Sequence, residues 1–569
     1  MSKTQGVNLS FVSRLINLFF IFLIIILSTF IALAWLTGGA VFSVGGVKLE
    51  VSSLDPWMIG FLLVVFFDSL LKGRATRWLG QKTLQGVAWV CNPSRSRAAA
   101  FILIVWIFTC LGMAHGLRHL SFRTHAFDLT FLHQPLFYPF FPRALTCDVC
   151  DGGRYFGEHL AFSLYLIAPI TRFFREFIFH DHLIFMLQIL ILAFPLWFGL
   201  KRGPLKDHPG LWFFSVLFIL CCRGFRNAAS WDFREDVLVF AFLLGASLAV
   251  YRRRIFYFFI FLVLALFSKE NIAFITPFIA IPIMWDSGLM LSQKQRRWIS
   301  LAVILVSVIW GFISFHWLMP VLSDGTESSN EIVSRFHEFG STPREVLITL
   351  LTSPQAWWKL FSAHLLRWES LKYLVLLLTP FLYFIRFSPF WVFPVVPGVL
   401  MNLLSSAETQ RSFNFHYELM ILPFLIFGLW AGMAEWAKRA ENVNHSKNLV
   451  IAMLIALAVS GRWPGRQIQL YWPTREQVLD SFFFSRLQSD NQGVAATLPI
   501  LAQISHLPRL VPLSVPSAGI PEFHQVSRLM LDFRDPRQKR MMDDLQVLGW
   551  RQEDVSPSGR YGVVGRLKK

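Results

Sequence analysis

Long uncharged apolar runs alternate with polar, often basic segments along almost the whole chain. A helix needs about 20 residues to cross the hydrocarbon core of a bilayer, and a helix satisfies its own backbone polar groups there. The run at 15–36 is the clearest span. It is longer than the roughly 7–15 apolar residues of a secretory signal and other spans follow it, so we interpret it as an uncleaved anchor.

The other apolar runs predict further spans, several of them short for a full crossing. They lie at 57–71, 98–116, 182–200, 210–222, 236–251, 255–268, 272–285, 298–320, 371–385, 389–404, 416–436 and 448–460. The pattern therefore predicts an all-α polytopic membrane protein of about 13 transmembrane helices.

The composition supports the same class. Hydrophobic residues make up 54% of the 569 positions and charged residues only 15%, against about 25% charged in soluble domains. This balance excludes a soluble enzyme, a disordered chain and a disulfide-dense secreted module.

Basic residues indicate the orientation, because Lys and Arg concentrate in cytoplasmic loops. With the N-terminus in the cytoplasm, the basic clusters share one side; they lie at 72–97, 201–206, 252–254, 294–297 and 438–447. The net charge of +18 then reflects topology and contact with anionic lipid headgroups, and no nucleic-acid partner is expected. Residues 255–285 must fold as a two-helix hairpin, since one crossing would place 252–254 and 294–297 on opposite sides.

The long polar segments then lie outside, at 117–181, 226–235, 321–370, 405–415 and beyond about 462. We divide the chain into an N-terminal transmembrane hairpin with a basic loop (1–97), a multi-span membrane domain (98–462) and an extracytoplasmic domain (463–569). The last is predicted to be a small α/β or α+β domain, with strands near 494–497, 509–513, 530–533 and 561–566 and helices near 499–505 and 540–548.

Two features of the outer loops suggest chemistry. Cys147 and Cys150 form a C-x-x-C pair, for which we expect a local disulfide, with two free thiols as the alternative; a zinc site would need two more ligands. Asp128 lies between Phe127 and Leu129 shortly after a span. A lone loop carboxylate is usually solvated, but a partly desolvated one is costly unless it is paired or useful, and a tuned pKa would suit it to general-base catalysis.

Lys269 and Glu270 lie at the outer tip of the hairpin. As neighbours on a helix they would not face each other, so each needs a different partner. Lys269 either closes an ion pair with another loop or holds a phosphate, the natural partner of an ammonium group. His416 enters the next span from the same side, where it either lines a helix junction or binds a ligand. The sequence contains no P-loop, H-E-x-x-H or G-x-S-x-G motif, which argues against an ATP-driven pump and the commonest hydrolases.

Several short motifs together resemble the domain of unknown function 2079 family of predicted membrane proteins. They include Ala126-Phe127-Asp128-Leu129, Gly157-Glu158-His159, Ser268-Lys269-Glu270-Asn271, Asn402-Leu403-Leu404-Ser405 and Phe415-His416-Tyr417. The resemblance covers roughly 98–530. That family in turn resembles the GT-C class of integral-membrane glycosyltransferases, which place an acid in the first large outer loop and take sugar from a polyprenyl-phosphate donor.

The resemblance implies a GT-C-like membrane domain with Asp128 as its loop acid. Many GT-C enzymes carry a D-x-D or E-x-D pair, whereas Leu129 and Thr130 follow Asp128, so we expect no metal or other cofactor. The preferred function is transfer of a sugar from a polyprenyl-phosphate donor to an envelope or lipid acceptor on the extracytoplasmic face. The alternatives are a transporter or flippase of a lipid-linked or small anionic solute, and a non-catalytic scaffold.

In the preferred hypothesis each candidate residue has a role. Asp128 removes the proton of the acceptor hydroxyl, and Glu158 and His159 orient the acceptor or Asp128. The leaving phosphate and the substrates are bound by Arg123, Lys269, Glu270, His416 and Tyr417.

This site exists only if its residues share one membrane face. Thiol-reactive probes that cannot cross the membrane are expected to label cysteines introduced at or beside 128 and 269 from outside, and cysteines in the 252–254 cluster only from the cytoplasm. Labelling of the 128 and 269 regions from opposite sides would contradict the hypothesis.

Overall fold

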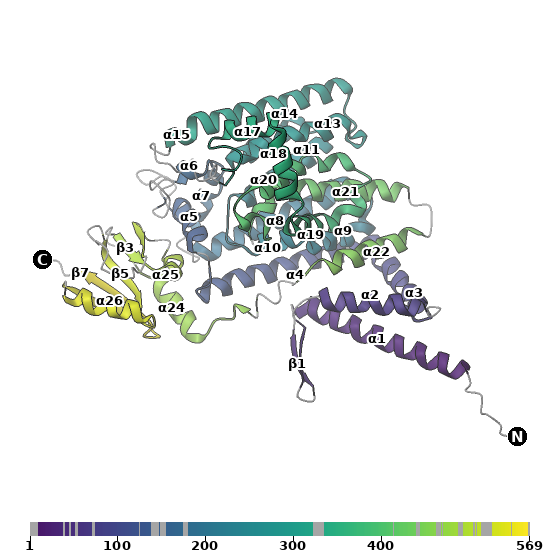
Figure 1. Cartoon of the computed structure of the whole chain (residues 1–569), viewed down its shortest axis with the longest axis horizontal. Helices are drawn as coiled ribbons and strands as arrows, with labels where there is room; N and C mark the ends of the chain where they lie inside the picture. The colour runs from purple at the N-terminus through teal and green to yellow at the C-terminus, as the bar shows by residue number, and fades with distance from the viewer. Residues whose placement is uncertain are drawn as a thin grey trace.

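The computed structural model describes residues 9–566 apart from 38–39, 45–46, 52–54, 71–73, 125, 138–146, 148–154, 175–179, 323–334, 414, 440–443, 462–467, 469, 488–492, 505–506, 508, 514–525 and 548. A helical bundle forms its centre, the first helices lie against one side of the bundle, and a small sheet domain lies at the opposite end (Figure 1).

The N-terminal part consists of apolar helices and a short hairpin. These elements are α1 (Leu9–Thr37), β1 (Ala40–Val44), β2 (Val47–Val51), α2 (Asp55–Leu70) and α3 (Arg74–Val90). β1 and β2 pair antiparallel, and α1 packs along α2 and α3. The two strands were not predicted from the sequence.

The bundle is built from helices of very different length. The longer ones are α4 (Pro93–Leu120), α8 (His180–Arg202), α9 (Trp212–Cys221), α11 (Asp236–Tyr251), α12 (Ile255–Leu266), α14 (Gln293–Ile313), α19 (Trp368–Ile385), α20 (Val395–Leu404), α21 (Leu422–Lys438) and α22 (Asn444–Ala458). α21 is buried on nearly all sides, as expected for a helix that is apolar all round. It contacts α11 and α19, and at Gly432 even a Cβ atom would lie 2.1 Å from the carbonyl oxygen of Phe384.

Among the described residues, four helical segments are long and apolar enough to cross a membrane: Pro93–Leu120, Asp181–Arg202, Gln293–Leu322 and Trp368–Ile385. A fifth arises if α9 and its 3-10 lead-in are joined to α10 (Arg223–Ser230), which bends away by 73°. Further apolar helices are shorter than a full crossing. The architecture is thus mainly helical as predicted, but it does not confirm about 13 spans, because many predicted runs are broken into short helices.

The segment after α12 shows such a break. The chain is extended at Lys269 (φ −164°) and continues as η4 (Glu270–Phe274), η5 (Thr276–Ile279), α13 (Ala280–Trp285) and η6 (Ser287–Leu289). η6 contacts α11, and the buried Arg296 of α14 donates hydrogen bonds to the carbonyl oxygens of Ile283, Met284 and Asp286. Because the chain is extended at Lys269, Lys269 and Glu270 do not lie in one regular helix, and their side chains contact other elements.

Short helices cover the end of the bundle where the long polar loops lie. They are α5 (Ala126–Phe137), α6 (Tyr155–Glu158), α7 (Leu164–Phe174), α15 (Met319–Leu322), α17 (Pro343–Thr352), α18 (Pro354–Lys359), the π-helix η8 (Leu360–Leu365), η10 (Glu408–Arg411) and η11 (Tyr417–Met420). Other short turns are η2 (Pro204–Asp207), η3 (Pro209–Leu211), η7 (Ser314–Leu318) and η9 (Pro389–Val392). Cys147 is disulfide-bonded, in line with the expected disulfide, while Cys150 lies outside the described residues.

The C-terminal domain is a five-stranded mixed sheet of order β4-β3-β5-β7-β6. Its elements are α24 (Arg475–Ser485), β3 (Gly493–Ala496), α25 (Leu498–Gln503), β4 (Leu510–Pro512), β5 (Val526–Asp532), α26 (Pro536–Val547), β6 (Trp550–Val555) and β7 (Tyr561–Arg566). β3 pairs parallel with β4 and β5, and β7 pairs antiparallel with β5 and β6. The predicted α/β character is confirmed, whereas β6 and α24 were missed.

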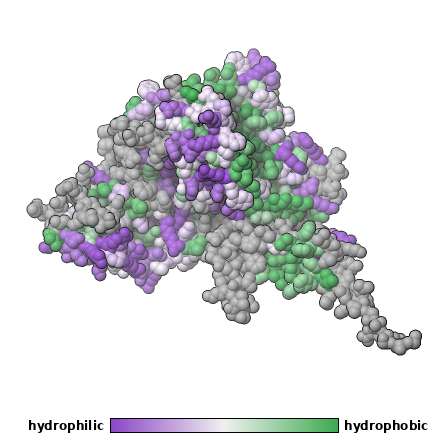
Figure 2. All heavy atoms as spheres, viewed as in Figure 1, coloured by the Kyte–Doolittle hydropathy of each residue, from purple (hydrophilic) through white to green (hydrophobic). Residues whose placement is uncertain are grey.

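The sheet domain packs directly on α5, the helix that carries Asp128. Leu129 is buried in one cluster with Phe484 and Ile500, and Gln134 Nε2 donates to the carbonyl oxygen of Leu507 at 3.2 Å. The visible surface of the domain is largely hydrophilic, in contrast to the hydrophobic α1 (Figure 2). The domain thus packs against the helix that carries Asp128.

Candidate functional site

The turn Trp231–Glu235 between α10 and α11, together with the first residue of α11, places four charged side chains inside the protein. Asp232, Arg234, Glu235 and Asp236 are all buried. Buried charges are stable only when they are paired and hydrogen-bonded, so the neighbours of this turn define the polar centre. Asp232 pairs with Arg118 of α4.

Lys269 reaches this turn from the break after α12. Its buried ammonium Nζ lies 2.8 Å from Glu235 Oε1 and 2.6 Å from Asp236 Oδ2. Glu235 also accepts a hydrogen bond from the Tyr155 hydroxyl of α6 at 3.0 Å. His416 Nε2 lies 3.4 Å from the same Asp236 oxygen. The Lys269 ammonium therefore bridges two carboxylates. The same carboxylates also contact Tyr155 of α6 and His416 at the start of η11.

Arg234 connects this centre to Asp128. Its NH1 donates to Asp128 Oδ1 at 3.3 Å and its Nε lies 3.5 Å from Glu235 Oε2. The second oxygen of Asp128 accepts from Trp231 Nε1 at 3.1 Å, and the Asp128 side chain is 18% exposed. Asp128 is thus oriented by two donors and remains partly exposed.

His159 and Glu270 form a second pair beside Arg234. His159 Nδ1 lies 3.2 Å from Glu270 Oε1, and Leu160 N donates to Glu270 Oε2 at 3.1 Å. Arg234 NH2 lies 3.5 Å from His159 Nε2. Because the guanidinium can only donate, this geometry favours the imidazole tautomer with its proton on Nδ1.

These groups line a small polar cavity of about 60 Å³. Five predicted site residues contribute to its wall: His159, Lys269, Glu270, His416 and Tyr417. Asp128 is not among the lining residues, but it contacts Arg234, which is. The sequence had suggested that Lys269 and Glu270 need different partners, and the structure confirms it.

Two predicted residues lie elsewhere within the described part of the chain. Arg123 is exposed and donates to the carbonyl oxygen of Leu470 at 2.8 Å. Glu158 is half-buried at the end of α6 and is not among the cavity-lining residues. The sequence assigned Arg123 to the leaving phosphate and Glu158 to orienting the acceptor or Asp128, and neither residue lines this cavity.

The prediction missed several wall residues. They are Arg234, Asn271, Arg335, Phe336, Met401, Asn402, Gln410 and Met420. The sequence held a signal for Arg234, because an arginine among three acids directly before an apolar run must find buried partners. Arg335 and Gln410 had none, since they arrive from loops whose folding no local pattern specifies; Ser406 N donates to the carbonyl oxygen of Arg335 at 2.8 Å and joins these loops.

The ion pairs shift the acidity of the buried groups outside the spans. Burial raises the pKa of Glu235, but Arg234 and Lys269 outweigh it and hold that pKa well below its usual range. Burial and the charge of Glu235 raise the pKa of Tyr155 well above its ordinary value. Burial likewise opposes ionisation of Glu270, and the facing His159 lowers its pKa below the usual value. Among the described residues, no group of three or more His, Cys, Asp or Glu side chains has a geometry that could hold a metal ion.

The chain belongs to the family described as "Predicted membrane protein (DUF2079)", whose sequence profile matches residues 118–564. This confirms the resemblance seen in the motifs, and with the apolar helices it establishes an integral membrane protein. The match includes both the polar cavity and the C-terminal sheet. None of the curated proteins matches the chain.

One solved structure that can be superposed is the crystal structure of ArnT from Cupriavidus metallidurans bound to undecaprenyl phosphate. It shares 13% sequence identity over 85% of this chain and 98% of that chain, with a TM-score of 0.46. At this level of similarity, neither the fold class nor the activity of this chain follows from that protein.

The lowered pKa of Glu270 predicts a specific acid sensitivity. A carboxylate whose pKa is depressed by folding stabilises the protein fully above its unfolded pKa, near 4.5, and loses that contribution as pH falls through the folded value. In melting-temperature measurements on purified protein between pH 7 and 3, the wild type should lose more stability below about pH 4.5 than Glu270→Gln. Parallel curves for the two proteins would show that the His159–Glu270 pair is not formed.

Proposed function

We propose that this protein is a membrane glycosyltransferase that moves a sugar from a polyprenyl-phosphate donor to an envelope or lipid acceptor on the extracytoplasmic face. The observation that carries the proposal is the convergence, at one end of the bundle, of a partly exposed carboxylate with a histidine–carboxylate pair and two arginines. The polar groups gather at the ends of apolar helices, which suits a reaction at the membrane surface better than passage through the bundle.

Asp128 is the group we assign to proton transfer. As the acceptor hydroxyl attacks the anomeric carbon of the sugar, the bond from that carbon to the phosphate oxygen breaks, and Asp128 takes the hydroxyl proton. Trp231 and Arg234 hold the carboxylate in place. His159, fixed by Glu270, would orient the acceptor beside it, and His416 and Tyr417, which also line the cavity, would contact the substrates.

The leaving phosphate needs cationic partners. Lys269 lines the cavity, but its charge is already shared by Glu235 and Asp236, so we assign it mainly to holding the site together. Arg234 is likewise paired with Asp128 and Glu235, so we assign the phosphate to Arg335, which lines the same cavity. At about 60 Å³ the cavity has room for only a few waters, so the segment with Arg335 and Phe336 would have to move for a sugar to enter.

The orientation remains part of the proposal. We place the N-terminus in the cytoplasm, the basic clusters inside, and the polar cavity and C-terminal domain outside, with about 13 crossings. The disulfide at Cys147 supports an oxidising, extracytoplasmic side for the loop that follows Asp128.

Replacement of Asp128 by Asn tests the proposal. The variant keeps the size of the side chain and an acceptor for Trp231 but cannot take a proton, so transfer should fall by about 10²–10⁴-fold. The readout is the profile of envelope glycans and glycolipids in a deletion strain that carries the variant, with protein level and melting temperature measured alongside.

Asp207→Asn is the matched control, because Asp207 is an exposed acid whose ion pair among the described residues is with the neighbouring Lys206. This variant should restore the wild-type profile. A normal profile with Asp128→Asn would show that Asp128 has no catalytic role. Movement of an unmodified lipid-linked solute across the membrane would show that the protein is a transporter rather than a transferase.

A further inference from the structure

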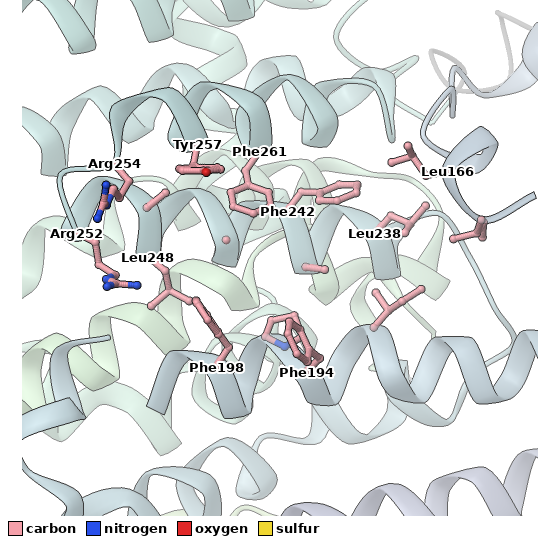
Figure 3. Close-up of a pocket in the computed structure, with 16 residues that line it drawn as sticks. Leu166, Phe194, Phe198, Leu238, Phe242, Leu248, Arg252, Arg254, Tyr257 and Phe261 are labelled. Atoms are coloured by element: carbon pink, nitrogen blue, oxygen red, sulfur yellow. The ribbon is translucent and has the colours of Figure 1, made fainter. Parts of the chain in front are cut away.

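A second, much larger cavity lies apart from the polar site. It is an apolar groove of about 770 Å³ between α7, α8, α11 and α12. Phe194 and Phe198 of α8 form one wall and Phe242 and Phe261 form the other (Figure 3). The groove shares no lining residue with the polar cavity among the described residues, so it requires a separate explanation.

The groove faces the surroundings of the bundle. Phe194 is 68% exposed, Tyr257 54% and Leu166 51%, and α8 is one of the helices long and apolar enough to cross a membrane. In an integral membrane protein such exposed apolar side chains meet lipid rather than water. The groove follows α11 from Leu238 to Arg252, the residue after the helix; these 14 steps span about 21 Å at 1.5 Å per residue.

One end of the groove is basic. Arg252 and Arg254, which follow α11, lie together at this end with Tyr257 of α12, whereas Leu166 and Leu238 lie at the other (Figure 3). No described residue forms an ion pair with either arginine. Two uncompensated guanidinium groups at the mouth of an apolar groove match an anion with an apolar tail, and phosphate is the anion that guanidinium pairs with best.

We propose that this groove binds an anionic glycerophospholipid of the surrounding bilayer. Its phosphate lies against Arg252, Arg254 and the Tyr257 hydroxyl, and one acyl chain follows the phenylalanines along α11. A chain that spans one leaflet covers about 15 Å, half of the hydrocarbon core, so a groove of about 21 Å accommodates one acyl chain with its glycerol phosphate. A long polyprenyl chain would extend beyond it.

The lipid would act as a structural part of the bundle. It would fill the space between α8, α11 and α12. α11 begins at Asp236, the carboxylate that pairs with Lys269, so this ion pair and the basic end of the groove lie at opposite ends of the same helix. The proposal is independent of glycosyl transfer, because it concerns a different cavity and needs no reaction.

The test is lipid binding to the full chain purified in detergent, followed by native mass spectrometry. Dioleoyl phosphatidylglycerol, dioleoyl phosphatidylcholine and undecaprenyl phosphate are titrated separately. We expect phosphatidylglycerol to bind about ten-fold more tightly than phosphatidylcholine. Arg252→Gln and Arg254→Gln should each weaken phosphatidylglycerol binding by roughly five-fold.

Arg253→Gln is the matched control, because Arg253 is exposed in the same loop but does not line the groove; its affinity should equal that of the wild type. Ala241→Phe narrows the groove while keeping both arginines, and it should weaken binding of both glycerophospholipids. Equal losses in all three arginine variants, full binding by Ala241→Phe, or binding of undecaprenyl phosphate in preference to phosphatidylglycerol would each overturn the proposal.

Discussion

The polar end of this protein depends on one buried ammonium group. Lys269 lies between Glu235 and Asp236, and burying any one of these charges without the others would be costly. Through the same carboxylates, Tyr155 and His416 are tied to the start of α11. Elements far apart in the sequence therefore meet at one point, and the remaining candidate side chains take their positions around it.

Much of the fold could be predicted from the sequence. Apolar runs specify helices in lipid because no other open structure satisfies the backbone, and short apolar segments within the polar tail indicated strands of the C-terminal sheet. β6 (Trp550–Val555) was missed because only Trp550 on this edge strand is buried, so it lacks the alternation of a half-buried strand. Helix length was less predictable: hydropathy predicted one helix over 272–285, whereas the chain there forms η4, η5 and the short α13.

The candidate site was also predictable only in part: its residues could be found from the sequence, but their partners could not. Lys269, Glu270, His159 and His416 could be found because ionisable residues beside apolar runs are rarely accidental. Which partner each one takes could not be found, because pairing depends on contacts across the bundle. Arg234 shows this most clearly, since only the fold reveals that it contacts both Asp128 and Glu235. Conversely, the sequence assigned Arg123 to the leaving phosphate, but its guanidinium contacts the main chain of Leu470.

The central claim is tested most directly by the stability of Lys269→Met, compared with the triple variant Lys269→Met, Glu235→Gln, Asp236→Asn and with the surface control Lys206→Met. The free energy of unfolding of the purified protein should fall by about 3–5 kcal/mol in Lys269→Met, because two buried carboxylates lose their shared cation. Most of it should be recovered in the triple variant, and less than about 1 kcal/mol should be lost in Lys206→Met. If Lys269→Met is as stable as Lys206→Met, the buried ammonium does not organise the site.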